Sequence, residues 1–380
     1  MEGFVHLHVH SEYSLLDGAN IISGMVARAA ELGMDALALS DHGNLFGAIA
    51  FYDACKAAGV KPILGMEAYI SPTERTDRSM GNQSQACYHL LLLAMNETGW
   101  RNLLKLSSRA YLEGFYYKPR VDRELLAEFN EGLICATACL SGEIPSAILG
   151  GRKDQAERIA GEYRDIFGPE RLFIEVQKQG IPDQNRVNGP LMELADKLGL
   201  GVVGTNDVHF LTRDDKASHE VLTAISTGKV VGDSPGLHYS TELYLKSPEE
   251  MRHALADLPG AADNTLRIAE MCDVELDFTA KHLPRFATPP GKTDTEHLRE
   301  LCLAGMKDRF GEDNITDEHI QRLDRELGVI EGKGYSSYVL IVHDFVQYAN
   351  GNDIPRSPRG RGWATLLGHC RGISAVDPHR

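Results

Sequence analysis

Residues 4–10 read Phe-Val-His-Leu-His-Val-His, and this stretch near the start of the chain governs how the rest is interpreted. Its alternation of apolar residues and histidines predicts a strand, in which side chains two residues apart point to the same face. We therefore expect His6, His8 and His10 on one face, with the apolar residues packed on the other. Imidazole is the commonest neutral metal ligand. The stretch indicates a metal site, provided that the rest of the chain supplies further ligands.

Apolar runs of strand length alternate along the chain with amphipathic helical runs, as in residues 21–32. Gly33, Gly59 and Gly199 follow such helical runs, at positions where helices commonly end. This repeated βα pattern is typical of a barrel. The predicted strands are 4–10, 36–40, 62–70, 88–95, 132–138, 171–177 and 200–206.

Side chains able to bind a metal stand at or just past most of these strand ends. In a barrel built from βα units, the strand ends gather at one face, where the active site forms. We therefore expect these side chains to lie together with His8 and His10. They are Asp17, Asp41, His42, Glu67, His89, Cys139, Asp207 and His209.

Each of these residues also has a structural interpretation. A buried histidine is often a hydrogen-bonded core residue, and Cys139 alone could be a small buried hydrophobe. Glu67 could pair with a cation, and Asp41 or Asp207 could cap a helix. For His6, deeper in its strand, structural and ligand roles both stay open. Because the structural interpretations would have to hold at every position independently, the pattern favours a multinuclear metal site.

The ligand types restrict the chemistry of this site. Mixed imidazole and carboxylate donors suit zinc, manganese or iron, and a thiolate at Cys139 would favour zinc at one position. Magnesium also stays open. The donors are too many for one ion, so we expect two or three divalent ions. Clustered divalent ions activate water and stabilise attacking and leaving oxygens, which is what phosphoester hydrolysis requires.

The same residues carry a resemblance to a known family. His8-Val-His10, Ser40-Asp-His-Gly43, Gly65-Met-Glu67, Cys139 and Asn206-Asp-Val-His209 match in order the motifs of the polymerase and histidinol phosphatase (PHP) domain. Longer phrases, among them GVKPILGMEAYI, EGFYYKPRVD and YLKSPEEM, resemble the bacterial DNA polymerase III alpha subunit. This resemblance runs from about residue 4 to about residue 350.

The resemblance implies an α/β fold, a distorted (β/α)7 PHP barrel holding up to three metals, with 3′–5′ exonuclease activity where the ligand set is complete. No ligand of the set is missing here. The metal ligands implied are His8, His10, Asp17, His42, Glu67, His89, Cys139, Asp207 and His209, and the catalytic residues are His8, His10, Asp41, His42, Asp207 and His209.

A second domain is expected from residue 280, after a PHP domain over 1–279, because a proline-rich connector starts at His282. Helical patterns follow at 294–310, 316–332 and 336–351, and GYSSYVLIVHDFVQYA resembles the start of the family's polymerase palm. Arg359-Gly360 match its phosphate-binding loop and suggest weak phosphate contact. Arg361 and Trp363 interrupt its run of small residues, so a solvated basic tail is an equal alternative.

In that family the polymerase carboxylates lie beyond the position matching Arg380. We therefore expect no DNA polymerisation by this chain, whether it is a fragment, a truncated gene product or part of a longer protein. Three hypotheses remain: a metal-dependent 3′–5′ exonuclease, a free-standing phosphatase of small esters, and a non-catalytic scaffold that docks a proofreading subunit. The implied partners are a DNA 3′ end and other holoenzyme subunits, with the sliding clamp bound through the missing part.

Composition agrees with a large soluble protein. The chain has 380 residues, 43% of them hydrophobic, which is ample for more than one domain. Seven cysteines without disulfide-like spacing indicate a reducing, cytoplasmic compartment. The sequence shows neither a transmembrane run nor a signal-peptide pattern. A net charge of −15 argues against a general basic surface for nucleic acid, although local contacts remain compatible with it.

Overall fold

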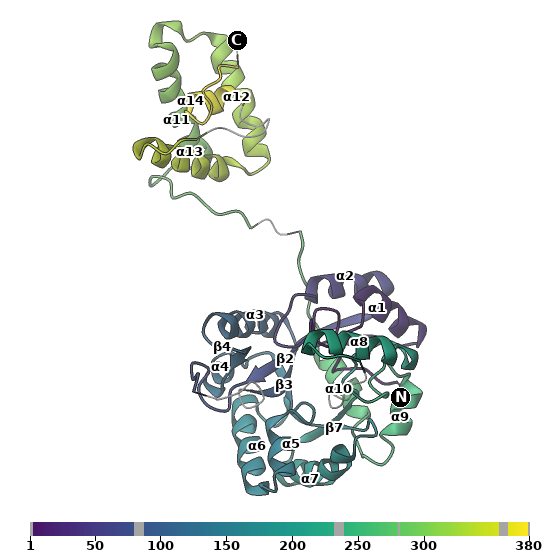
Figure 1. Cartoon of the computed structure of the whole chain (residues 1–380). Helices are drawn as coiled ribbons and strands as arrows, with labels where there is room; N and C mark the ends of the chain where they lie inside the picture. Colours follow the sequence, from purple (N-terminus) through teal and green to yellow (C-terminus); the bar gives the residue numbers. More distant parts are fainter. Residues whose placement is uncertain (1–2, 80–86, 232–238, 280–281, 357–363, 379–380) are drawn as a thin grey trace. The chain divides into compact units, whose positions relative to one another are not determined.

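The computed structural model describes residues 3–79, 87–231, 239–279, 282–356 and 364–378. The chain divides into two compact units, Met1–Leu276 and Asp277–Arg380, each of which is described by itself. Within the described residues, unit 1 contains the strands and unit 2 is helical (Figure 1). The expected class, an α/β barrel followed by a helical region, is confirmed.

Unit 1 is built on one curled sheet in the order β4-β5-β2-β3-β6-β7-β8, with β1 pairing parallel to the first half of β2. β5 pairs with the end of β2, and β6, β7 and β8 run parallel to one another. Six of the seven predicted strands are therefore found within a residue or two. The strands are β1 (Ala36–Leu39), β2 (Lys61–Ile70), β3 (Tyr88–Ala94), β4 (Phe115–Tyr116), β5 (Lys118–Val121), β6 (Leu133–Ala136), β7 (Leu172–Gln177) and β8 (Gly201–Thr205).

Residues 4–10, the remaining predicted strand, form an isolated bridge between Val9 and Val208 but no regular ladder, so that prediction is wrong in detail. On one side, the amides of Ala38 and Ser40 donate to the carbonyls of His6 and Val9, both at 2.9 Å. On the other, His10 and His8 exchange hydrogen bonds of 2.8 and 3.0 Å with Val208, which follows β8. The segment thus lies between β1 and the end of β8. It closes the sheet into a distorted barrel.

The expected repeat of βα units fails at β3. β3 runs antiparallel to both β2 and β6, and no helix lies in the described part of the connection between β2 and β3. Apolar periodicity carries no information on strand direction, which explains the error. The reversal has one useful consequence: His89, near the start of β3, lies at the edge where the parallel strands end.

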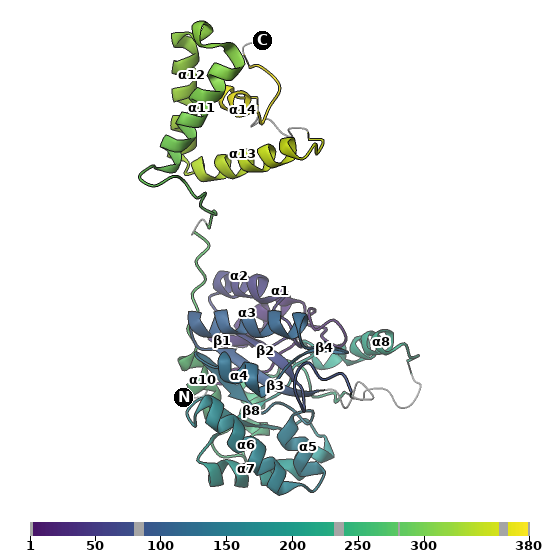
Figure 2. The same ribbon diagram turned by 90° about the vertical axis from the view of Figure 1, so that its left-hand side faces the viewer.

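Helices cover the outside of the sheet, with α1 to α3 on one side and α5 to α7 on the opposite side (Figures 1 and 2). As predicted, Gly59 and Gly199 end α2 and α7 in left-handed conformations with φ of 72° and 66°. The helices of unit 1 are α1 (Ile22–Glu31), α2 (Ala48–Ala58), α3 (Glu97–Leu112), α4 (Arg123–Glu128), α5 (Glu143–Leu149), α6 (Lys153–Phe167), α7 (Pro182–Leu198), α8 (Lys216–Thr227), α9 (Pro248–Ala254) and α10 (Asp263–Met271).

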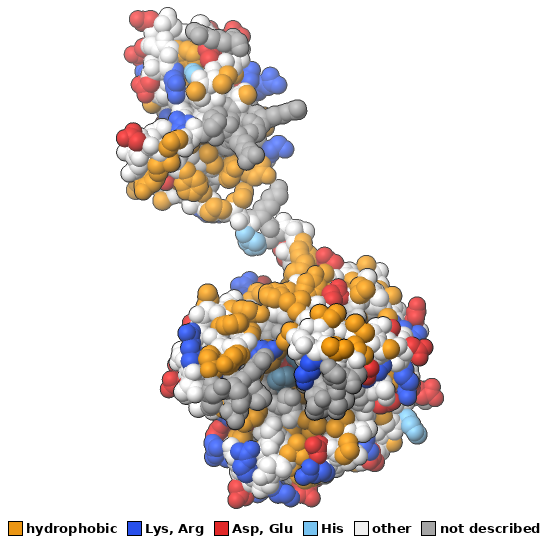
Figure 3. Space-filling view, in the orientation of Figure 1, with side chains coloured by type: hydrophobic (Ala, Val, Ile, Leu, Met, Phe, Trp, Pro, Cys, Tyr) orange, Lys and Arg blue, Asp and Glu red, His pale blue; other side chains and the backbone are white. Residues whose placement is uncertain are grey.

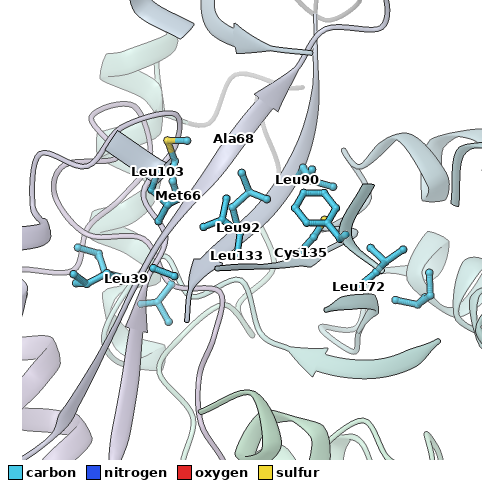
Figure 4. Close-up of a cluster of buried hydrophobic side chains, with 14 of the residues drawn as sticks. Leu39, Met66, Ala68, Leu90, Leu92, Leu103, Leu133, Cys135 and Leu172 are labelled. Atoms are coloured by element: carbon cyan, nitrogen blue, oxygen red, sulfur yellow. The ribbon is translucent and has the colours of Figure 1, made fainter. Parts of the chain in front are cut away.

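The two faces of the sheet pack into separate apolar clusters. The larger cluster joins the sheet to the surrounding helices through side chains such as Leu92 and Leu103 (Figure 4). The smaller one includes Leu91 and Leu93, the alternate residues of β3, together with Val5 and Leu7. β3 is therefore buried on both faces and anchors the barrel.

Unit 2 consists of α11 (Asp294–Phe310), α12 (Asp317–Gly332), α13 (Ser336–Gly351) and the short α14 (Leu366–Cys370) around one apolar cluster. Three of these helices agree with the predicted ranges to within a residue. Arg359, Gly360, Arg361 and Trp363, where phosphate contact was predicted, lie outside the described residues. In the described part of the chain, none of the helices is both long and apolar enough to span a membrane.

Candidate metal centre

The predicted metal-binding side chains meet at one edge of the unit 1 barrel, around a cavity of about 1070 Å³. His8 and His10 come from the closing segment, and Glu67 comes from β2. Asp17 lies in the loop before α1, and the remaining members follow β1, β6 and β8 or begin β3, so that segments distant in sequence deliver them to one place. Those lining the cavity are Asp17, His42, His89, Cys139, Asp207 and His209. Figure 3 shows a histidine at the bottom of a hollow on this face.

Glu67 is the centre of one half of the cluster. Its carboxylate lies 2.5 Å from Nδ1 of His42, 2.9 Å from Nδ1 of His89 and 3.2 Å from Nε2 of His8. The thiol of Cys139 is 3.9 Å from Glu67 Oε1. Since Glu67 is only 1% exposed, these contacts form in a buried, low-dielectric environment.

Asp207 and Asp17 organise the other half. Asp207 Oδ1 lies 3.1 Å from Nε2 of His10 and 3.3 Å from Nε2 of His8. Asp17 lies 3.3 Å from Nε2 of His42 and 3.9 Å from Nε2 of His209. His42 therefore links Glu67 to Asp17, and His8 links Glu67 to Asp207.

Several of these converging atoms are buried without a hydrogen-bond partner in the described structure. They include His8 Nε2, Glu67 Oε2, His42 Nδ1 and His89 Nδ1. Buried polar atoms are normally hydrogen-bonded, and each exception needs an explanation. Imidazole nitrogens and carboxylate oxygens that converge in a buried site without well-aligned hydrogen bonds form a donor set that fits divalent ions.

Three overlapping groups of side chains have geometry suited to an ion, since within each group the ligand atoms lie within 4.8 Å of one another. Among the described residues, His10 and His42 each belong to two of these groups, so the groups overlap and represent alternative positions for an ion. The groups are His10, His42 and His209; His8, His10 and Asp207; and His42, Glu67 and His89.

Glu175 fixes the orientation of His8, and we did not predict it from the sequence. Its Oε1 lies 2.7 Å from His8 Nδ1 and also accepts from Thr205 Oγ1 at 2.5 Å and Gln177 Nε2 at 3.1 Å. This carboxylate oxygen accepts from its three neighbours, so His8 Nδ1 carries a proton and Nε2 is turned toward Glu67 and Asp207. The signal in the sequence was an acidic residue inside the apolar strand LFIEVQ.

Ser14 fixes His10 in a similar way, with Asp41 behind it. The Ser14 hydroxyl donates to Asp41 Oδ1 at 2.8 Å, so its oxygen must accept from His10 Nδ1 at 3.1 Å. His10 Nε2 is thereby left free to face Asp207. Ser11 donates its amide and its hydroxyl to the same carboxylate, at 2.7 and 2.8 Å. The structure therefore places Asp41 behind His10, rather than among the converging ligand atoms.

The remaining ligands are also held by their surroundings. His209 Nδ1 bonds the carbonyl of Asp207 at 2.7 Å, which directs Nε2 toward Asp17. Tyr239 donates its hydroxyl to Asp17 Oδ2 at 2.7 Å, and His219 bonds the Asp17 carbonyl at 2.7 Å. Tyr239 and His219 are further supporting residues that the sequence did not single out.

Unusual backbone geometry occurs at the site itself. Asp207 has φ of 47° and Ala138, which precedes Cys139, has φ of 59°. Such left-handed conformations are strained for residues other than glycine and persist where the surroundings enforce them. Gly43, next to His42, has φ of 62°, and a Cβ there would lie 2.8 Å from the ring of Tyr69. The chain is thus forced into turns that present these ligands.

Burial and charge act against each other in the cluster. Burial disfavours the charged form of His8, but Asp207, Glu175 and Glu67 raise its pKa well above the usual range. Burial would raise the pKa of Glu67, yet His89, His8 and His42 hold it well below its usual range. Burial, with neighbouring His42 and His209, lowers the pKa of His10 to about 3. The Glu67 carboxylate is therefore ionised, as a metal ligand must be.

His6 is apart from this cluster. Its Nε2 bonds the carbonyl of Lys246 at 2.9 Å, and burial lowers its pKa to about 4. Of the two roles left open by the sequence, its position supports the structural one.

Each unit contains a region that matches a known protein family. Residues 6–179 match the PHP domain, and residues 296–380 match the bacterial DNA polymerase III alpha NTPase domain. Across 99% of its length, the chain is 45% identical to the DNA polymerase III subunit alpha of Treponema pallidum and 43% identical to that of Borreliella burgdorferi. The chain belongs to the bacterial DNA polymerase III alpha-subunit family.

The chain spans about a third of the length of these family members, 32% for the Treponema protein and 33% for the Borreliella protein. Among solved structures, an amidohydrolase from Chromobacterium violaceum is similar with a TM-score of 0.37 and 16% identity, over 54% of this chain and 87% of that one. A two-domain protein from Bacteroides vulgatus, containing a predicted PHP-like metal-dependent phosphoesterase, has a TM-score of 0.32 and 14% identity over 55% and 52% of the two chains.

Proposed function

We propose that unit 1 is a metal-dependent phosphoesterase that hydrolyses the 3′-terminal phosphodiester of DNA, as a 3′–5′ exonuclease. The observation that carries this proposal is the buried cluster of imidazole and carboxylate donor atoms centred on Glu67 and Asp207, beside one large cavity that His42, His89 and Asp207 line. Membership of a replicative polymerase family supports DNA as the substrate. The proposed domains are the PHP domain over 1–279 and the beginning of the palm over 280–380.

The residues proposed to hold the metals are those predicted from the sequence. Two or three bound divalent ions would supply an activated water and stabilise charge on the phosphate oxygens. The protein orients the ligands through Glu175 and Ser14, and Cys139 would favour zinc at one position. We assign Asp41 to positioning His10. The proposed ligands are His8, His10, Asp17, His42, Glu67, His89, Cys139, Asp207 and His209.

We also propose that the chain contributes to a DNA-replicating assembly through partners of the alpha subunit, including a proofreading subunit. DNA polymerisation is not part of this proposal. Metal binding by unit 1 would be independent of that activity, since the ligands described all belong to unit 1.

The purified chain should contain metal and digest a 3′-labelled single strand or primer. The double variant His8→Ala/His10→Ala should lose both properties. His253→Ala/His282→Ala, which removes two exposed histidines outside the site, should retain them. A small phosphomonoester is assayed in parallel. Absence of metal and of digestion in the unaltered chain would contradict the proposal and favour a scaffold, and turnover of the small ester alone would favour a phosphatase.

A further inference from the structure

A small side pocket opens beside the metal centre. Its volume is about 140 Å³, and it shares Leu16, His42, Tyr69 and Lys118 with the lining of the main cavity. The two spaces therefore border each other along these side chains, one of which, His42, belongs to the metal centre itself. A group held in the side pocket would lie next to whatever is bound at the ligand cluster.

Aromatic rings form much of this side pocket and of the surface around it. Phe46 and Tyr111 line it and are 59% and 39% exposed, although large apolar side chains are usually more buried. Their ring centroids are 6.2 Å apart, and Tyr111 lies at the same distance from Phe115, which is 50% exposed. Hydrophobic side chains gather on this face over α3 and β4 (Figure 3). The rings thus form an open row, two members of which, Phe46 and Tyr111, line the pocket that borders the metal centre.

Lys118 gives this surface a positive charge. Its ammonium group lies 5.1 Å from the centre of the Tyr69 ring and borders both spaces. In a chain of net charge −15, a cation between an aromatic row and a metal centre is a local feature suited to an anion. Aromatic rings beside a cation are the combination that proteins use for single-stranded nucleic acid, in which bases stack and phosphates pair.

We propose that the side pocket, lined by Phe46 and Tyr111, is a subsite for a nucleobase near the 3′ end of a single strand, with Lys118 on the adjoining phosphate. A cavity of about 150 Å³ accommodates a benzene ring, so the pocket has room for one planar ring. A protein partner would also cover apolar rings, but it would not explain why their pocket borders His42 of the ligand cluster. The proposal rests on the proposed function and specifies its substrate as an unpaired end.

Binding, rather than cleavage, tests the subsite, so that its failure is distinguishable from failure of the exonuclease. The probe is a fluorescein-labelled single strand of thymidines, with phosphorothioate links at its 3′ end, titrated in EDTA with anisotropy as the readout. Parallel probes carry an abasic residue at the last, second-last or third-last position, or in the middle of the strand. Exonuclease activity is measured separately on unmodified DNA with added metal.

We expect the unaltered chain to bind the complete strand more tightly than at least one of the three strands that carry an abasic residue near the 3′ end. The expected difference is roughly 5- to 150-fold, corresponding to about 1–3 kcal/mol per stacked base. Phe46→Leu/Tyr111→Leu, which removes the rings but keeps apolar bulk, should abolish that difference. Phe46→Tyr/Tyr111→Phe should preserve it. Tyr348→Leu, at a 67% exposed site in unit 2, should leave it unchanged.

Equal binding of complete and abasic strands by the unaltered chain would overturn the subsite. So would a leucine variant that retains the difference, or one that weakens all strands equally. Thermal unfolding of each variant shows whether it is folded. If the double leucine variant is unfolded, the binding difference is measured instead with the single variants Phe46→Leu and Tyr111→Leu. If the unaltered chain distinguishes the strands but digests none with any metal, the subsite stands and the exonuclease proposal fails.

Discussion

At the residue scale, the Ser14 hydroxyl decides which nitrogen of His10 faces the metal centre. Ser14→Ala removes the acceptor of the His10 Nδ1 proton, so the ring loses its fixed orientation. We expect divalent-metal affinity to fall about 10- to 100-fold, as for other supporting residues of metal ligands. Chelator competition measures the affinity. Ser11→Ala is the matched control, because Ser11 also bonds Asp41 but has no hydrogen bond to His10 among those described; equal losses in both variants would contradict the role of Ser14.

Glu175 provides a second test at this scale. Glu175→Ala removes the acceptor of the His8 Nδ1 proton, and because His8 is 0% exposed, water cannot replace that acceptor. Metal affinity should therefore again fall about 10- to 100-fold. Glu175→Gln keeps a neutral acceptor oxygen and should lose less. Glu170→Ala, whose carboxylate is exposed and pairs with Arg267, serves as the control. Unchanged metal affinity in Glu175→Ala would show that His8 is oriented by other contacts.

Residues of this kind mark the limit of prediction from sequence. The ligands were predictable because histidines and acids at strand ends are conspicuous against an apolar pattern. Ser14 and Tyr239 lie outside strand ends and have ordinary residue types, so only contacts distant in sequence reveal them. Glu175 did interrupt an apolar strand. Asp41 was predictable as a member of the site. Its position behind His10 was not, because it is fixed by hydrogen bonds from the side chains of Ser11 and Ser14.

At the scale of the element, β3 is the strand on which both apolar clusters depend. Leu92 is fully buried on one face, and its truncation would leave a cavity among the helices and strands of the larger cluster. Leu92→Ala should lower the free energy of unfolding by about 2–5 kcal/mol. Denaturant titration measures this loss, with Leu112→Ala, at an 81% exposed position, as the control. A loss below about 1 kcal/mol would contradict the assignment of β3 to the core.

The contact between His343 of α13 and Arg371, which follows α14, makes unit 2 sensitive to pH. Burial and the nearby Arg371 guanidinium lower the pKa of His343 from its ordinary 6.5, while Asp344 opposes the shift. The unfolded chain therefore takes up this proton first as pH falls below 6.5, and the folded state loses stability. Hydrogen exchange should show α13 and α14 less protected at pH 5.5 than at 7.5. His343→Gln should reduce this difference; an unchanged difference would assign it to other groups.

Strand identity and helix ranges were predictable element by element, whereas strand direction was not. Leu90 to Leu93 give the same apolar pattern whichever way β3 runs. The hairpin of β4 and β5 was missed because its strands have two and four residues, too few for periodicity to register. The closing segment 4–10 lacks a ladder because its backbone partners are shared between β1 and residue 208.

At the scale of the whole molecule, the described ligands all belong to unit 1, so metal binding should stabilise that unit selectively. A ligand that binds only the folded state stabilises it by about 2.7 kcal/mol at a concentration 100 times its dissociation constant. Removing metal with a chelator should therefore increase hydrogen exchange around Glu67, His89 and Asp207. The helices α11 to α13 should exchange at the same rate with and without metal. Equal deprotection of both units would show that they unfold together, and no change in unit 1 would contradict a metal centre there.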